Sequence, residues 1–254
     1  SWERRNAQIQ SHWFYGELVC DPVNPDRMYA PMTPLLMSED GGQTFNNIAQ
    51  TMVHSDHHTL WINPNDPEHL MSGNDGGVYV SRDGGKFWQW QSNLPVMQLY
   101  TVAIDMQEPF YHVYGGTQDN GSWGGPIGTR YSDGIANEDW TFISGGDGFY
   151  SVADPTDPNI IYSQSQYGVL YRTDRKSGEQ KRIQPWQPQE DEFPPYRWNW
   201  SAPFVISPHD PKTVYFGANV VFRSKDRGDS WERISPDLTR QLSRDELPLQ
   251  GKVQ

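Results

Sequence analysis

Residues 81–88 read Ser-Arg-Asp-Gly-Gly-Lys-Phe-Trp, and the pattern Ser-x-Asp-x-Gly-x-x-aromatic within them recurs along the chain. Two further copies span residues 38–45 and 224–231 and end on Phe45 and Trp231. The aspartate of this pattern can accept backbone N–H groups across a hairpin, and the glycine can take a positive φ. Three matches at the same fixed positions indicate a repeated hairpin, whose aromatic residue returns to a sheet core.

A second repeated element is a turn with two prolines that leads into a strand. It starts at Asp21, Asn63, Asp154 and Ser207, with a weaker copy at Asp105. Proline fixes φ, and Asp or Asn closes such turns through side-chain hydrogen bonds. We therefore expect this element to be structural as well.

The two elements keep a constant separation. The first proline of the turn and the aspartate of the box are 18, 19 and 18 residues apart in the three clearest repeats. A degenerate box lies at Asp174, and the third repeat keeps only a remnant at residues 132–134. Repeats start at positions 21, 63, 105, 154 and 207. Because four short strands with their turns need about 40–50 residues, the sequence predicts an all-β chain, a β-propeller of four-stranded antiparallel blades.

These motifs carry a resemblance. The pattern at residues 81–88 resembles the Asp box of bacterial neuraminidase (BNR) repeats. Its combination with the turn at residues 63–67, Asn-Pro-Asn-Asp-Pro, is similar to sortilin-type propellers and their bacterial relatives, often labelled glycosyl hydrolases. The resemblance covers residues 1–240 and implies a secreted or periplasmic protein. It leaves the activity open, because Asp boxes occur in sialidases, xyloglucanases and non-enzymatic receptors alike.

The start of the chain repeats a later segment. Ser-Trp-Glu-Arg at residues 1–4 matches residues 230–233, which follow the last box. We therefore expect residues 1–240 to hold about five blades of an incomplete propeller, truncated at both ends. Further blades would come from the same protein or from another chain, and residues 241–254 would form a polar tail or linker. The alternative is a five-bladed ring that this chain closes alone.

Composition excludes some classes of protein. The formal net charge is -12, and no basic stripe is present, which argues against nucleic-acid binding. The sequence contains no run of about 18 apolar residues, so it predicts no membrane-spanning helix. The single cysteine, Cys20, excludes an intrachain disulfide, which a large domain does not need.

Topology predicts where function lies. The double-proline turn joins the first and second strands of a blade, and the box joins the third and fourth, so both lie at one end. We expect binding at the opposite end, in the loops between second and third strands and in those entering each first strand. The candidate ligand-binding residues in these loops and beside them are His54, His57, Asn74, Gln118, Asn120 and Trp200.

The densest cluster of possible ligands is His-Ser-Asp-His-His at residues 54–58, with three of the seven histidines. One interpretation is a divalent-cation site, because imidazole and carboxylate are common metal ligands. The alternative is a hydrogen-bonded loop whose imidazoles satisfy backbone groups. In the first case the ligands are His54, Asp56 and His57, completed by Asp75 or Asp119.

Four aspartates at this end are candidate catalytic residues: Asp56, Asp75, Asp119 and Asp147. An inverting glycoside hydrolase needs two carboxyl groups about 6.5–9.5 Å apart. A sialidase would also need converging arginines for the substrate carboxylate, and the repeats do not bring arginines together. The sequence thus carries no convincing catalytic signature.

Three functions fit these observations. The first is a sortilin-like binding module for a protein or peptide partner. The second is a carbohydrate-active glycoside hydrolase with paired aspartates, and the third is a structural subunit of a larger assembly. Substitution of the carboxylates discriminates the first two, because only a hydrolase would lose its activity.

Overall fold

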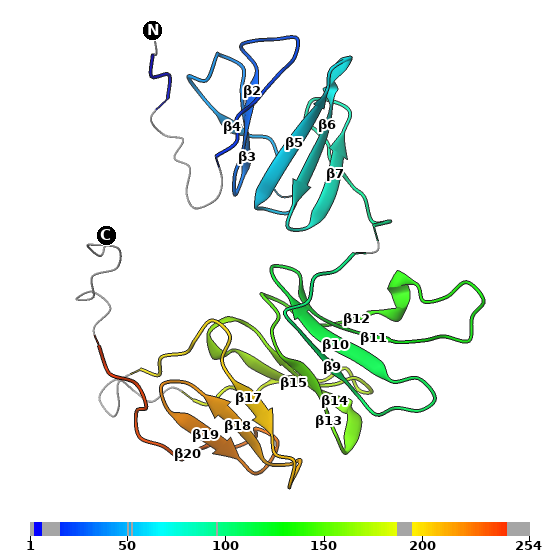
Figure 1. Ribbon diagram of the computed structural model, residues 1–254, viewed down its shortest axis with the longest axis vertical. Coiled ribbons are helices and arrows are strands. Elements are labelled where there is room, and N and C mark those ends of the chain that lie inside the picture. The colour runs from blue at the N-terminus through cyan, green and yellow to red at the C-terminus, as the bar shows by residue number, and fades with distance from the viewer. Residues whose placement is uncertain are drawn as a thin grey trace. The chain divides into compact units, whose positions relative to one another are not determined.

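The computed structural model describes residues 3–6, 16–49, 51, 53–94, 96–186 and 195–242. The chain divides into two compact units, Ser1–Met97 (unit 1) and Gln98–Gln254 (unit 2). The described residues form five four-stranded antiparallel sheets, so the predicted all-β class with propeller blades is confirmed (Figure 1). Most of the predicted tail at residues 241–254 lies outside the described residues, and the extent of a single propeller segment stays a prediction.

Unit 1 contains two sheets, each with its strands in chain order. Sheet 1 consists of β1 (Val19–Cys20), β2 (Met28–Pro31), β3 (Leu35–Ser38) and β4 (Asn46–Asn47). Sheet 2 consists of β5 (His57–Asn63), β6 (Asp66–Asn74), β7 (Gly77–Ser81) and β8 (Gln89–Trp90).

Unit 2 contains three sheets of the same order. Sheet 3 consists of β9 (Thr101–Ile104), β10 (His112–Thr117), β11 (Gly121–Pro126) and β12 (Thr141–Ser144), with a short 3-10 helix η1 (Asn137–Asp139). Sheet 4 consists of β13 (Ser151–Asp154), β14 (Asp157–Gln164), β15 (Leu170–Asp174) and β16 (Gln180–Arg182), with η2 (Gln166–Gly168). Sheet 5 consists of β17 (Phe204–Ile206), β18 (Val214–Gly217), β19 (Val221–Ser224) and β20 (Glu232–Arg233). No helix in the described part of the chain is long and apolar enough to cross a membrane.

The cores lie between neighbouring sheets of each unit. In unit 1, Tyr29 and Leu35 of sheet 1 pack in one cluster with Leu60, Leu70 and Trp88 of the second repeat. Burial of each such side chain contributes about 1.5–3 kcal/mol. The equivalent cluster of unit 2 joins sheets 4 and 5 through Tyr162, Leu170, Phe204, Val214 and Phe216.

Each Asp box is a hydrogen-bonded hairpin. Ser81 donates its hydroxyl to Oδ1 of Asp83 (2.8 Å) and accepts the backbone N–H of Gly85 (2.8 Å). The same Asp83 oxygen accepts the N–H of Phe87 at 2.9 Å. Gly85 has a φ of +91°, which only glycine adopts readily. The corresponding bonds recur in the boxes at residues 38–44 and 224–230, so the box aspartates stabilise the turn.

Box and double-proline turn lie at the same end of each sheet, as predicted. In four sheets the residue after the box aspartate donates its N–H to a carbonyl of the turn or of the strand that leaves it. The pairs are Gly41–Asp26, Gly84–Glu68, Arg175–Asn159 and Arg227–Lys212, at 2.8–2.9 Å. The degenerate box at Asp174 therefore occupies the box position of sheet 4.

The remnant box of the third repeat forms different bonds. The N–H of Gly134 bonds to the carbonyl of Tyr131 rather than to the hydroxyl of Ser132. Residues 127–140 form a long connection from β11 to β12 instead of a tight hairpin.

Candidate binding loops

The loops opposite the boxes link neighbouring sheets through the same backbone bond in both units. In unit 1 the N–H of His57 bonds to the carbonyl of Met32 at 2.8 Å, and in unit 2 the N–H of Gly148 bonds to that of Thr117 at 2.9 Å. Asp56 and Asp147 each precede the donor, so they occupy the same repeat position. The topology predicted this equivalence from residue counting alone.

In unit 1, backbone bonds hold Asp56 in a left-handed conformation with a φ of 63°. Its N–H bonds to the carbonyl of Thr33 at 3.0 Å, and its carboxylate accepts the hydroxyl of Ser55 at 2.7 Å. The amide of Asn74 donates to the carbonyl of His54 at 3.0 Å. Asn74 therefore ties the loop after β6 to the loop that enters β5.

The three histidines of residues 54–58 have separate partners. His57 is buried, and its Nδ1 lies 2.8 Å from the hydroxyl of Ser72. Burial lowers the pKa of His57 to about 4, although the charge of Asp56 opposes the shift. Nε2 of His58 lies 2.7 Å from Oδ1 of Asp75. Nδ1 of His54 lies 3.1 Å from the carbonyl oxygen of Ser55, so only this histidine contacts a backbone group, whereas the other two contact side chains.

Among the described residues, no group of three or more His, Cys, Asp or Glu side chains is arranged to hold a metal ion. The cation site of His54, Asp56 and His57 therefore stays a prediction from the sequence.

In unit 2, Asp147 locks two loops together. Its side chain is buried, and Oδ1 accepts the backbone N–H of Asp119 at 3.0 Å. Asp119 has a φ of 61°, and beside it the N–H of Gly121 bonds to the carbonyl of Gly146 at 3.0 Å. Asp147 thus has a structural task, which is to hold Asp119 in a strained turn.

Within each unit, two of the predicted carboxylates lie in loops that are bonded to each other. Asp56 and Asp75 lie in adjacent loops of unit 1, and Asp119 and Asp147 are joined in unit 2. A catalytic pair drawn from both units stays a prediction.

In unit 2, the end opposite the boxes carries a row of aromatic side chains. Tyr100 stacks on buried Phe149 with ring centroids 5.0 Å apart, and Phe149 meets Trp200 edge-on at 6.2 Å. Trp200 in turn meets Tyr167 edge-on at 5.1 Å. Tyr100, Trp200 and Tyr167 are 46%, 42% and 58% exposed. We call these four residues the aromatic row.

Polar contacts fix the aromatic row in place. The hydroxyl of Tyr100 donates to Oε1 of Gln118 at 3.0 Å, and the N–H of Tyr167 bonds to the carbonyl of Trp200 at 3.3 Å. Tyr167 has a φ of 55°, rare for an aromatic residue. Sequence reasoning named Trp200, Gln118 and the exposed Asn120 as binding residues, whereas it did not name Tyr100, and it placed Tyr167 in a loop without giving it a role. Tyr167 follows Gln166 in a predicted binding loop, which was the available signal.

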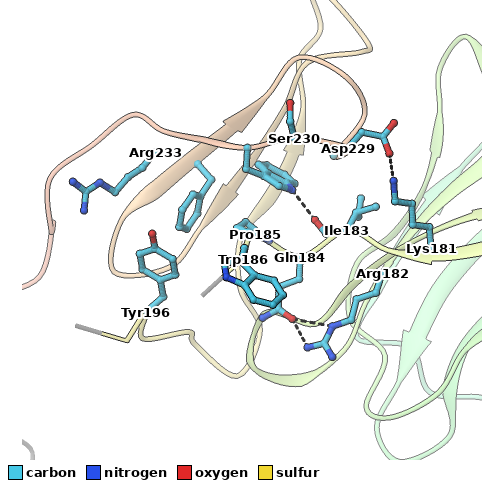
Figure 2. Close-up of a pocket in the computed structure, with 13 residues that line it drawn as sticks. Lys181, Arg182, Ile183, Gln184, Pro185, Trp186, Tyr196, Asp229, Ser230 and Arg233 are labelled. Atoms are coloured by element: carbon cyan, nitrogen blue, oxygen red, sulfur yellow. Dashed lines mark hydrogen bonds and ion pairs between the residues drawn. The ribbon is translucent and has the colours of Figure 1, made fainter. Parts of the chain in front are cut away.

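Two cavities lie elsewhere, at equivalent places between neighbouring sheets. The indole N–H of Trp88 bonds to the carbonyl of Ile48 at 3.2 Å, and that of Trp231 to the carbonyl of Ile183 at 2.6 Å. Next to the first contact is a cavity of about 570 Å³, and next to the second is one of about 350 Å³. The second, shown in Figure 2, lies between β16, the segment after it and the box of sheet 5.

Comparisons with known proteins give low similarity throughout. Neither a protein-family model nor a curated protein sequence matches the chain. Among solved structures, the chain is similar to a GH74 xyloglucanase from Xanthomonas campestris, with 17% identity and a TM-score of 0.39 over 87% of this chain and 38% of the xyloglucanase. It is also similar to YCF48 bound to D1 peptide, with 14% identity and a TM-score of 0.33 over 82% of this chain and 64% of YCF48. The extracellular domain of BT4673 from B. thetaiotaomicron shows 15% identity and a TM-score of 0.36 over 90% of this chain and 29% of that domain. The chain therefore spans less than two thirds of each of these structures.

Proposed function

We propose that this chain is a sortilin-like β-propeller binding module, which holds a protein or peptide partner on the aromatic row of unit 2. The observation that carries the proposal is the row itself, in which exposed Tyr100 and Trp200 both contact buried Phe149, and exposed Tyr167 contacts Trp200. Tyrosine and tryptophan dominate the centres of protein interfaces because they bury a large area at low entropic cost. The resemblance of the repeats to sortilin-type proteins supports a secreted or periplasmic location.

The surroundings of the row favour binding over hydrolysis. Asp147 is buried and accepts a backbone N–H of the neighbouring loop, which is a structural use of its carboxylate. The exposed side chains at this end also include Gln118 and Asn120, which can donate and accept hydrogen bonds to a peptide backbone. Rigid aromatic anchors with adaptable amides at the side are a common arrangement for peptide recognition.

The test is selection of peptides from a displayed random library on the intact chain, followed by direct titration with the synthetic peptide that is selected. Trp200→Ala and Tyr167→Ala should each weaken binding about tenfold or more, because each removes an anchor of the row. Trp90→Ala is the matched control, since Trp90 is also exposed (54%) but lies on β8 of unit 1. A selected peptide whose affinity depends on Trp90 and not on Trp200 would contradict the proposal.

The hydrolase alternative has its own readout. Release of reducing sugar from polysaccharides by the intact chain, abolished in Asp119→Asn, would replace the binding function by catalysis. Peptide binding that survives Asp119→Asn, without sugar release, is the expected result.

A further inference from the structure

The cavity between sheets 4 and 5 differs in chemistry from its equivalent in unit 1. Its lining includes three cations, Lys181, Arg182 and Arg233, and one carboxylate, Asp229. The cavity between sheets 1 and 2 is lined by two cations and two carboxylates: Arg27, Lys86, Glu39 and Glu68. Of these two cavities, the one between sheets 4 and 5 therefore has an excess of positive charge, in a chain whose formal net charge is -12.

The scaffold of the two cavities is the same, so the linings can be compared position by position. Ile48 and Ile183 both accept an indole N–H from the following box. Counting from these isoleucines, Arg182 stands where unit 1 has Asn47, and Trp186 stands where it has Thr51. The change from two small polar residues to a guanidinium and an indole occurs at positions that the fold does not require to be charged or aromatic.

The side chains that line this cavity come from two parts of unit 2, residues 181–186 with Tyr196 and residues 222–233. Figure 2 shows Trp186 in the middle of the lining, with Tyr196 and Arg233 on one side and Arg182 on the other. Trp186 is 88% exposed, so its indole face contributes little to the core. The guanidinium of Arg182 donates to the side-chain oxygen of Gln184. This contact uses only some of the five N–H donors of the guanidinium.

We propose that this cavity is a second binding site, which takes an acidic sugar, a hexuronate residue, independently of the partner on the aromatic row. The exposed indole face of Trp186 offers a flat apolar surface to the C–H face of a pyranose ring. Arg182 or Arg233 pairs with the carboxylate, because a planar guanidinium binds a carboxylate through two parallel hydrogen bonds. Gln184 and Ser230 in the lining supply groups for sugar hydroxyls.

The size of the cavity favours a sugar over an acidic peptide. Its volume of about 350 Å³ lies at the lower end of small-molecule sites, which suits one or two rings. Lys181 is paired with Asp229, so it holds the box of sheet 5 against β16. Arg182, whose guanidinium bonds to Gln184 through Nε and one terminal nitrogen, keeps N–H donors for the anion.

The test is titration of the intact chain with digalacturonate, followed by tryptophan fluorescence and calorimetry. Galactobiose of the same linkage is the matched neutral probe, since it replaces each carboxylate by a hydroxymethyl group. We expect digalacturonate to bind about tenfold or more tightly than galactobiose, and its affinity to fall as salt is added. Trp186→Ala, Arg182→Gln and Arg233→Gln should each weaken it about tenfold.

The equivalent cavity supplies the control variants. Thr51→Ala and Lys86→Gln change the unit 1 cavity and should leave the affinity for digalacturonate unchanged. The exposure of Trp186 means that its alanine variant should fold, which an unchanged unfolding curve checks. Equal binding of galactobiose, binding that ignores Trp186 and both arginines, no binding at about 10 mM digalacturonate, or tighter binding of an Asp-Glu-Asp tripeptide would each overturn the proposal.

Discussion

Sheets 1 and 2 of unit 1 can be compared with sheets 4 and 5 of unit 2. Each pair of adjacent sheets has the same kind of box hairpin at its interface, but different charged residues join the two sheets. In both pairs a box tryptophan donates its indole N–H to an isoleucine carbonyl of the preceding sheet. The glycine of that box lies against the same isoleucine, and a methyl group added at Gly85 or Gly228 would lie 2.8 or 2.5 Å from its Cδ1 atom. The apolar part of the interface is therefore repeated faithfully.

The charged part is not repeated. In unit 2, Arg227 of the last box reaches back to Asp154 in the turn of sheet 4, at 2.7 Å. In unit 1 the same box position is Gly84, and Arg27 of sheet 1 lies between Asp21 (3.5 Å) and Glu68 of sheet 2 (2.7 Å). Both turns thus start with a fully buried carboxylate, and the nearby arginine comes from a different blade in each case. A repeat can keep its buried acid and change the origin of the cation.

The largest expected difference between the two pairs of sheets is the loss of stability when Arg227 or Arg27 is replaced. Arg227→Gln leaves the fully buried carboxylate of Asp154 without its cation, which should lower the free energy of unfolding by about 3–5 kcal/mol. Arg27→Gln should cost less, about 0.5–1 kcal/mol, because Glu68 is 45% exposed and the contact to Asp21 is long. Urea unfolding curves of both variants measure the difference.

The pH dependence has a defined sign. Burial raises the pKa of Asp154, but the hydrogen bonds from Arg227 and Thr156 more than offset it, so the net pKa is lowered. The stabilisation is therefore present above the ordinary aspartate pKa and is lost as the pH falls below it. An Arg27→Gln variant that proves less stable than Arg227→Gln would reverse the comparison.

The shared hairpin should cost the same in both pairs. Ser81→Ala and Ser224→Ala each remove a buried hydroxyl that accepts the N–H of Gly85 or Gly228, at 2.8 and 2.7 Å. An unpaired buried N–H costs about 1–3 kcal/mol, so both variants should lose that much stability. Thermal unfolding measures it, and the peptide affinity of the folded protein should stay unchanged. Unequal losses would show that the two boxes are not equivalent.

The sequence was sufficient to predict the hairpins and blades because Ser, Asp and Gly at fixed spacing leave the backbone few conformations. It also placed Asp56 and Asp147 at one repeat position, because the distance from each turn sets the strand register. It could not predict the buried pair of Arg227 and Asp154, which are 73 residues apart. The aromatic row was partly missed for the same reason, since Tyr100 and Trp200 meet only through Phe149, in contacts between different sheets.

A smaller effect should distinguish the loops opposite the boxes. Unit 1 has buried His57 where unit 2 has Gly148. Because burial lowers the pKa of His57 to about 4, the unfolded chain binds a proton that the folded chain does not between about pH 6.5 and 4. The free energy of unfolding should therefore fall by about 1–2 kcal/mol as the pH drops through that window, and the contribution of His57 should be fully present above it.

The control for this effect is His57→Asn, which keeps a polar group beside Ser72 and removes the titration. The stability of the native chain relative to this variant should decline between pH 7 and pH 4.5 in urea unfolding. An imidazole signal of His57 that titrates at an ordinary pH in NMR spectra would contradict the lowered pKa.

The smallest expected effect concerns the box aspartates themselves. The hydroxyl and N–H of Thr44 hold the pKa of Asp40 at about 2, and those of Ser230 hold the pKa of Asp226 at about 2. Thr44→Val should raise the pKa of Asp40 toward its ordinary value and leave that of Asp226 unchanged, and Ser230→Ala should do the opposite. NMR titration of the two carboxyl groups measures both. Asp226 is exposed and Asp40 is half-buried, and both are ionised in the neutral range, so neither substitution should change the pH dependence of stability there. A shift of both carboxyl groups in one variant would mean that the boxes of the two units are coupled, rather than two independent copies of one hairpin.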